Sequence, residues 1–240
     1  MSIIVGIDGS DGEIWAITDA RNRTYDNDFK NSFVSKICKP EINGKKYFRG
    51  PIADGTGLGY AIDHGERYII NLRNNGNREP ILLTGYSRGG LGVIVIANRL
   101  RYRGIPVRAM MLFDPVDRHG SYSGTVIPNN VENLCNVMRN PQANSRHSFG
   151  NTGTAVASGS QTRVYRGGVR RFMCTHGGMG GVPWDARRDG KQPSDYIDEG
   201  SLEQLFNAHT NITYAEDVEH SEWVWNDVVP FLREHRFINF

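Results

Sequence analysis

The sequence predicts an α/β protein whose mainly parallel central sheet is covered by helices on both faces. Short apolar runs alternate along the chain with longer segments in which apolar residues recur at helical spacing, the pattern of a helix-covered parallel sheet. The chain has 240 residues, of which 38% are hydrophobic and 22% charged. This length and composition suit one substantial core, so we expect a single domain over residues 1–240.

Three strands and two helices are expected in the amino-terminal half. The strands are short apolar runs at 3–7, 81–84 and 107–113, and each stops at a turn or before a proline. One helix is expected over 58–74, where apolar residues fall at helical spacing. Another is expected from Leu91, in a segment that is apolar on nearly all sides, as in a helix packed centrally on a sheet.

The next part of the chain is expected to be less regular. Residues 118–161 are rich in Asn, Ser, Gly and Pro around one apolar island at 131–138. We expect a long, partly irregular excursion there, of the kind that often covers an active site. A strand pattern resumes over 164–175, broken by Gly167-Gly168, and a last short strand is expected at 211–215.

A helix is expected to end the fold. Ser221 is a candidate N-cap for a segment with apolar residues at helical spacing. Pro230 lies inside that segment and should kink or split the helix, because proline removes an intrahelical hydrogen bond.

Charge and cysteine usage limit the classes of partner and compartment. The 28 Lys and Arg residues against 26 Asp and Glu leave a formal charge of +2, and no long basic run is present, so a nucleic-acid partner is not expected. The first residues show neither a signal-like segment nor an integral membrane segment. Three widely spaced cysteines fit reduced thiols, so we expect a cytoplasmic protein.

A candidate nucleophile lies in the segment Gly85-Tyr86-Ser87-Arg88-Gly89-Gly90, between an apolar strand and an apolar helix. A G-x-S-x-G turn in this context lifts its serine out of the sheet. Gly85 and Gly89 have a steric reason, because side chains at these positions would collide where strand and helix close up. The alternative for Ser87 is a serine with a purely structural role in the turn.

The ends of the expected strands carry the polar residues Asp8, Ser87, Asp114 and His176. Because the carboxyl ends of parallel strands gather at one edge of a sheet, these residues are expected to converge. A serine needs a histidine base to act as a nucleophile, and the histidine needs a carboxylate to orient it. The chain order Ser87, Asp114, His176 is that of α/β-hydrolases, which predicts an α/β-hydrolase-like fold and a catalytic triad.

Two members of this triad have rivals. Asp117 is the nearest substitute for Asp114, whose alternative role is that of a turn or helix-cap carboxylate. His220 follows the last expected strand and precedes a helix, the usual position of the histidine in this fold. His176 is favoured because, like Asp114, it ends an apolar strand, and the glycines after it allow close approach.

Binding of the oxyanion is assigned to the amide of Arg88 and to an amide near Gly9 in the first loop. The Arg88 side chain opposes the dipole of the helix that it opens, so either a salt bridge or an anionic substrate group should compensate it. The segment Gly55-Thr56-Gly57-Leu58-Gly59 does not fit the dinucleotide fingerprint, and no zinc-ligand spacing surrounds His176. We expect no cofactor and no metal.

Several segments, among them 57–62 and 127–131, resemble in this order motifs of the α/β-hydrolase family that includes the lipase effectors of type VI secretion systems. Asp8-Gly9-Ser10 is similar to the family's DGT, residues 85–90 to GFSRGA, residues 114–116 to DTV, and residues 176–181 to HSDVGG. The resemblance covers roughly residues 3–185. It implies a triad of Ser87, Asp114 and His176 that acts on carboxylic esters, with lipid esters possible.

The sequence thus predicts a serine hydrolase with an esterase or lipase-like activity on a small-molecule or lipid ester. A non-catalytic module that keeps the fold and binds a ligand or protein in its cleft is the alternative, because a fold alone does not fix a function.

Overall fold

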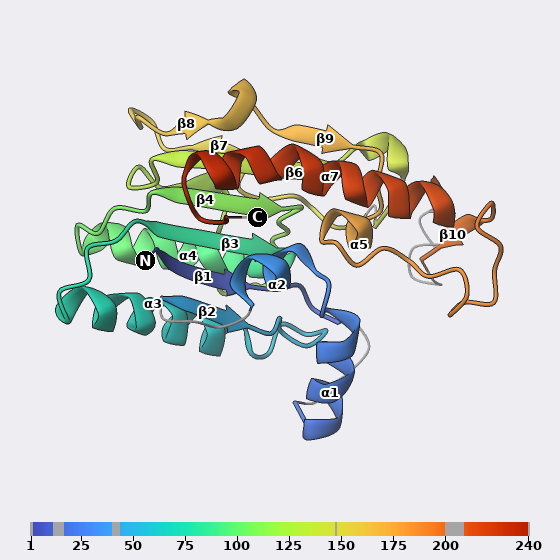
Figure 1. Cartoon of the computed structure of the whole chain (residues 1–240), viewed down its shortest axis with the longest axis horizontal. Coiled ribbons are helices and arrows are strands. Elements are labelled where there is room, and N and C mark those ends of the chain that lie inside the picture. Colours follow the sequence, from blue (N-terminus) through green and yellow to red (C-terminus); the bar gives the residue numbers. More distant parts are fainter. Residues whose placement is uncertain (1, 12–16, 40–43, 147, 200–208, 240) are drawn as a thin grey trace.

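The protein is built around a seven-stranded sheet in which every strand pairing is parallel (Figure 1). The structure, a computed structural model, describes residues 2–11, 17–39, 44–146, 148–199 and 209–239. The strand order is β2-β1-β3-β4-β6-β8, and β9 also pairs with β6. The strands are β1 (Ile3–Ile7), β2 (Lys45–Phe48), β3 (Ile81–Tyr86), β4 (Ala109–Phe113), β6 (Asn133–Arg139), β8 (Arg163–Val164) and β9 (Arg170–Phe172).

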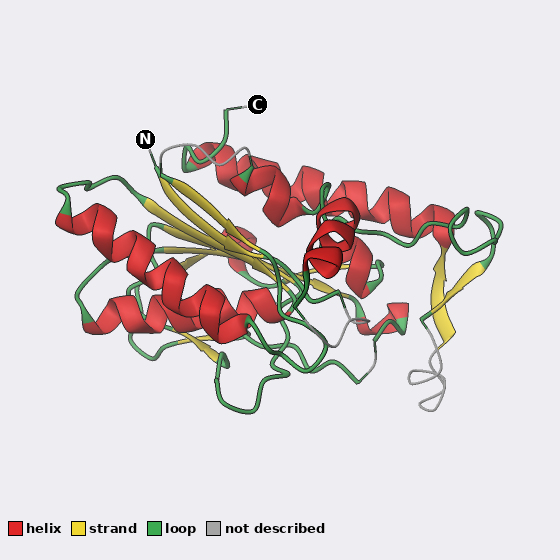
Figure 2. Ribbon diagram, turned by 90° about the horizontal axis from the view of Figure 1, so that it is seen from below, coloured by secondary structure: helices red, strands yellow, loops and turns green. Residues whose placement is uncertain are grey.

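Helices cover both faces of this sheet (Figure 2). The helices α3 (Leu58–Asn74) and α4 (Arg88–Tyr102) pack on the face that contains Leu83. On the other face, which contains Leu82, lie α1 (Asp19–Asp28), α2 (Phe33–Cys38) and α7 (Tyr214–Glu234). Neighbouring residues of one strand thus enter opposite halves of the core, which is why these strands are apolar at almost every position. The fold is α/β, with a parallel central sheet covered by helices on both faces, as expected.

The elements expected in the amino-terminal half are present. The strands at 3–7, 81–84 and 107–113 correspond to β1, β3 and β4, and the helix over 58–74 is α3. Helix α4 begins at Arg88 rather than at Leu91, because it starts directly after the turn at Ser87. The polar helix α1, the short α2 and β2 had no clear pattern and were not expected.

The excursion over 118–161 was expected to be partly irregular, and one of its elements belongs to the sheet. The apolar island at 131–138 is the greater part of β6, a fully buried strand that lies next to β4. Around it lie only short elements, η1 (Pro141–Ala143) and the paired two-residue strands β5 (Val126–Ile127) and β7 (Ala155–Val156). The strand β6, which lies between β4 and β8, is thus part of a segment whose composition is otherwise typical of a loop.

The expected strand over 164–175 is broken. Its residues form the end of β8, the short turn η2 (Tyr165–Gly167) and β9, because Gly167 adopts a φ of +79°. Beyond β9, Thr175 caps the short helix α5 (His176–Met179). The last expected strand is β11 (His209–Thr213), which pairs antiparallel with β10 (Tyr196–Asp198) in a separate sheet.

The final helix begins earlier than expected. Thr213 caps α7 in a capping box with Glu216, so the expectation that Ser221 is the cap was wrong. Ser221 lies inside the helix, and its hydroxyl donates to the carbonyl of Gly178 at 2.7 Å. Pro230 also lies inside α7, and the helix continues to Glu234 without being split.

Cys38, Cys135 and Cys174 are buried free thiols. Among the described residues, no helix has the length and apolar character needed to cross a membrane.

Candidate active site

Polar side chains gather at the carboxyl edge of the sheet. Asp8 directly follows β1, Ser87 follows β3 and Asp114 follows β4, while His176 opens α5 beyond β9. All four side chains are buried. The sheet order places β1 and β3 side by side and β4 next to β3, so the convergence expected from the strand ends is present.

The turn at Ser87 has the strained geometry that the two glycines allow. Ser87 has a φ of 56° and a ψ of −128°, backbone angles that a residue other than glycine rarely adopts. A Cβ atom on Gly89 would lie 2.1 Å from the carbonyl oxygen of Ile7, and one on Gly85 would lie 2.5 Å from that of Gly89. A side chain at either position would therefore prevent the close contact of β1, β3 and α4 around Ser87.

A chain of hydrogen bonds joins Ser87, His176 and Asp114. The hydroxyl of Ser87 lies 2.9 Å from Nε2 of His176, and Nδ1 of the same ring lies 2.6 Å from Oδ2 of Asp114. An ionised carboxylate only accepts, so Nδ1 carries the hydrogen and Nε2 is free to accept from Ser87. This tautomer is the one that general-base chemistry requires.

Asp114 is completely buried and is held by further donors. Its oxygens accept hydrogen bonds from the Arg139 guanidinium at 2.5 Å, the Arg139 amide at 3.2 Å and the Asn151 side chain at 2.7 Å. Burial alone would raise the pKa of Asp114, but Arg139 and His176 hold that pKa well below its usual range. Asp114 is therefore ionised. Asp117, its rival, is exposed.

His176 is fixed from several sides. Its amide donates to the hydroxyl of Ser145 at 2.8 Å, and its carbonyl accepts from the hydroxyl of Tyr86 at 2.9 Å. The edge of the Phe149 ring meets the imidazole at a centroid distance of 5.2 Å. Burial lowers the pKa of His176, and nearby guanidinium groups lower it further, against the opposite effect of Asp114. The ring is neutral at pH 7.

His220, the other candidate for the base, does not contact Ser87. His220 lies on α7, where Nδ1 contacts the carbonyl of Met173 and the ring packs on Trp223. The structure thus brings His176, and not His220, within hydrogen-bonding distance of Ser87.

Arg139 is a site residue that sequence reasoning missed. It is 6% exposed, and besides Asp114 its guanidinium donates to the carbonyls of Ser145 at 2.9 Å, Arg146 at 3.1 Å and Phe149 at 2.5 Å. One side chain therefore connects the carboxylate to the loop that covers His176. The available signal was its position at the end of an apolar run, the same feature that marked Asp114.

Gly9 lies against the serine, as expected of a first-loop residue. A Cβ atom on Gly9 would lie 3.2 Å from that of Ser87. The Gly9 amide, however, donates to Oδ1 of Asp8 at 3.0 Å, so it reaches an oxyanion only if that bond opens. The role of Gly9 stays a prediction. The amide of Arg88 is the first of α4 and has no acceptor one turn back.

Asp8 belongs to the loop rather than to the chain of Ser87. Its carboxylate contacts the hydroxyl of Ser32 and accepts from the hydroxyl of Tyr47 at 3.0 Å. Burial raises the pKa of Asp8 to about 7. These bonds fix the backbone of the first loop beside Ser87.

The Arg88 side chain does not form the salt bridge that was one of its two expected roles. Its guanidinium donates to the carbonyl of Ile52 at 3.0 Å and to the hydroxyl of Ser10 at 3.4 Å. Within the described part of the chain, no carboxylate lies at ion-pair distance from it. Burial lowers the pKa of Arg88, and the neighbouring charge of Arg118 lowers it further.

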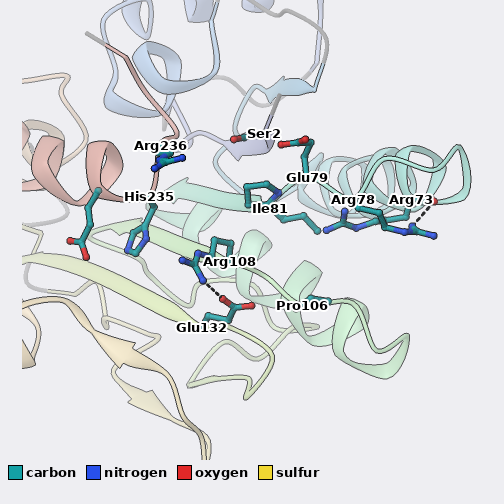
Figure 3. Close-up of a pocket in the computed structure, with 12 residues that line it drawn as sticks. Ser2, Arg73, Arg78, Glu79, Ile81, Pro106, Arg108, Glu132, His235 and Arg236 are labelled. Atoms are coloured by element: carbon teal, nitrogen blue, oxygen red, sulfur yellow. Dashed lines mark hydrogen bonds and ion pairs between the residues drawn. The ribbon is translucent and has the colours of Figure 1, made fainter.

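A pocket of about 680 Å³ lies at the opposite edge of the sheet (Figure 3). Its lining includes residues that directly precede or begin strands, such as Ser2, Ile81 and Arg108, together with Arg78 and His235. The carboxyl ends of the same strands carry Asp8, Ser87 and Asp114. This pocket is therefore separate from the Ser87 site.

Comparisons with known proteins give distant structural likenesses. No family model matches the chain, and no curated protein matches its sequence. A crystal structure described as a YdeN-like hydrolase from Pectobacterium atrosepticum is similar over 57% of this chain and 63% of its own, with 12% identity and a TM-score of 0.36. An alpha/beta hydrolase superfamily protein from Enterococcus faecalis is similar over 48% and 39%, with 17% identity and a TM-score of 0.28. The chain spans less than two thirds of each.

Proposed function

We propose that the protein is a serine hydrolase that cleaves carboxylic esters through an acyl-enzyme on Ser87. The observation that carries the proposal is the continuous hydrogen-bonded chain from the Ser87 hydroxyl through His176 to the buried Asp114. The strained turn at Ser87 adds to it, because strain of this kind persists where a reactive side chain must be presented.

In the first half of the reaction, the Ser87 oxygen attacks the ester carbonyl carbon while Nε2 of His176 takes the hydroxyl proton. Asp114 accepts the Nδ1 hydrogen bond throughout and stabilises the imidazolium that forms. When the tetrahedral intermediate collapses, the bond to the alcohol oxygen breaks and His176 returns the proton to that oxygen. The products are the free alcohol and an ester between the acyl group and Ser87.

In the second half, a water molecule replaces the alcohol. His176 takes a proton from the water as its oxygen attacks the acyl carbon, and it then returns the proton to the Ser87 oxygen as the acyl bond breaks. The negative charge on the carbonyl oxygen is bound in both halves by the Arg88 amide and by an amide of the first loop. Each such donor contributes about 2.7 to 4 kcal/mol in enzymes of this class.

Membership of the family of type VI lipase effectors, and with it activity on lipid esters, belongs to the same proposal. It is supported by the motif residues themselves, because the segments at 8–10, 85–90, 114–116 and 176–181 lie at one edge of the sheet.

A fluorophosphonate probe tests the proposed nucleophile, because it reacts covalently with activated serines. The native protein should be labelled and Ser87→Ala should not, while the control Ser158→Ala, which removes an exposed hydroxyl, should be labelled like the native protein. Absence of labelling in the native protein would favour a non-catalytic binding module.

Hydrolysis of 4-nitrophenyl butyrate tests the base. His176→Ala should lower kcat by about three orders of magnitude or more. The control His220→Ala changes a histidine that lies outside the site, and it should retain activity. The reverse result would assign the base to His220.

A further inference from the structure

Arg88 presents unused hydrogen-bond donors beside the proposed nucleophile. The side chain is 8% exposed, and among the described residues only its Nη1 has acceptors, the Ile52 carbonyl and the Ser10 hydroxyl. Its Nε and Nη2 atoms have no acceptor there. Because neither atom is fully buried, solvent reaches both of them. A guanidinium fork of this kind matches the oxygens of a carboxylate or phosphate.

A second guanidinium lies near the first. Arg118 is exposed, and its guanidinium carbon lies 4.3 Å from the centroid of the Phe149 ring, which itself meets the imidazole of His176. The positive charge of Arg118 also lowers the pKa of Arg88. Within the part of the chain that the structure describes, Arg118 has no ion-pair partner.

The other charges around the site are largely balanced within the protein. Arg139 is paired with Asp114 at 2.5 Å, and Arg146 lies 3.9 Å from the carboxylate of Glu199. Asp54 offsets part of the charge at Arg88, but its carboxylate accepts from the Thr56 amide at 2.8 Å and is fully exposed.

The start of α4 adds to the positive potential. Arg88 is the first residue of this 15-residue helix, where the aligned peptide dipoles leave a partial positive charge. A cation at that position is unfavourable unless an anion compensates it, and a bound anion would be stabilised by helix and guanidinium together.

We propose that the substrates of this protein are esters that carry an anionic group, a carboxylate or a phosphate, which Arg88 and Arg118 bind beside Ser87. The proposal rests on the proposed hydrolase function and names the substrate class for that site. Arg88 is a substrate-binding residue in this scheme, and Arg118 attracts the same group from the rim.

Matched pairs of charged and neutral esters test this. One pair, mono-4-nitrophenyl glutarate and 4-nitrophenyl hexanoate, carries the charge on the acyl side, and a second pair, 4-acetoxyphenyl phosphate and phenyl acetate, carries it on the alcohol side. The readout is the ratio of kcat/KM, charged over neutral, in each variant relative to the native protein. This double ratio removes the intrinsic reactivity of each ester.

In at least one pair, Arg88→Gln should lower the ratio tenfold or more, because it removes hydrogen bonds to a charged group. Arg118→Gln should lower it several-fold, because an exposed cation is screened by solvent. The control Arg78→Gln, which removes an exposed guanidinium from the pocket at the opposite sheet edge, should leave the ratio unchanged. The pair that responds identifies the side of the ester that bears the charge.

The outcomes separate this inference from the hydrolase function. If Ser87 is labelled and neutral esters are cleaved, but neither Arg88→Gln nor Arg118→Gln changes either ratio, the anionic substrate class is refuted while the hydrolase stands. An equal fall in the Arg78→Gln control would show an effect of net charge only and would also refute it. If the native protein neither labels nor cleaves any of the esters, both proposals fail.

Discussion

Replacing Arg139 by methionine should move the pH dependence of catalysis and weaken the fold. The methionine replaces the unbranched apolar part of the side chain but removes the charge and the hydrogen bonds to Asp114 and to the carbonyls of the covering loop. Loss of one partner from a buried ion pair typically destabilises a protein by about 3 to 5 kcal/mol. Urea unfolding at pH 7 would measure this change.

The effect on pH dependence has a definite sign. His176 must be neutral to accept a proton, so kcat/KM falls as the pH drops through the pKa of His176, which Arg139 lowers. Removing Arg139 raises that pKa, and the acid limb of the profile moves to higher pH.

The size of the shift follows from the separation of the charges. Nη1 of Arg139 lies 3.5 Å from Nδ1 of His176. With an effective dielectric constant of roughly 20, this separation gives a repulsion of about 5 kcal/mol between Arg139 and a protonated His176, as an upper limit. Because Asp114 pairs with both groups and offsets most of this repulsion, we expect the acid limb to move by only a small part of this limit.

The assay is the profile of kcat/KM for 4-nitrophenyl butyrate between about pH 4.5 and 8. Arg139→Lys serves as the control, because it keeps a positive charge and should hold the acid limb near its native position while it loses the hydrogen bonds to the loop. An unchanged acid limb, or one displaced to lower pH, in a folded Arg139→Met protein would refute the reasoning.

Three further changes have expected outcomes. Asp114→Asn should lower kcat by about four orders of magnitude in the butyrate assay, because an amide favours the wrong tautomer of His176. Gly89→Ala should lower the free energy of unfolding by at least about 1 to 3 kcal/mol, because its Cβ would lie 2.1 Å from a β1 carbonyl oxygen, whereas Gly150→Ala, in open space, should be neutral in urea unfolding. Because burial raises the pKa of Asp8 to about 7, the protonated side chain stabilises the fold below about pH 4, and this contribution is lost as the pH rises to about 7. In Asp8→Asn, the free energy of unfolding should therefore decline less over this pH range, as measured by urea unfolding.

Local patterns in the chain were enough for the elements that carry the candidate nucleophile. The strand before Ser87, the glycines on either side of it and the helix after it are contiguous, so their steric requirement is written in one short segment. Asp114 and His176 could be selected because polar residues at strand ends gather at one edge of a parallel sheet.

The partners of these residues were beyond sequence reasoning. Arg139 reaches Asp114 because β6 pairs with β4, and Asn151 reaches it from the segment after β6, where it bridges to Val116. The composition around β6 had favoured an irregular segment. The choice between His176 and His220 rested on an argument about position, whereas the structure gives a distance to Ser87.

The alternation of strands and helices, the sharp turn at Ser87 and the candidates for the triad can be inferred from the sequence, because each depends on residues that are neighbours in the chain. The tertiary structure was needed to show which histidine meets Ser87 and that Arg88 has no carboxylate partner among the described residues. These facts depend on the distances between segments far apart in sequence. Such distances follow from the packing of the whole core, and no short segment encodes them.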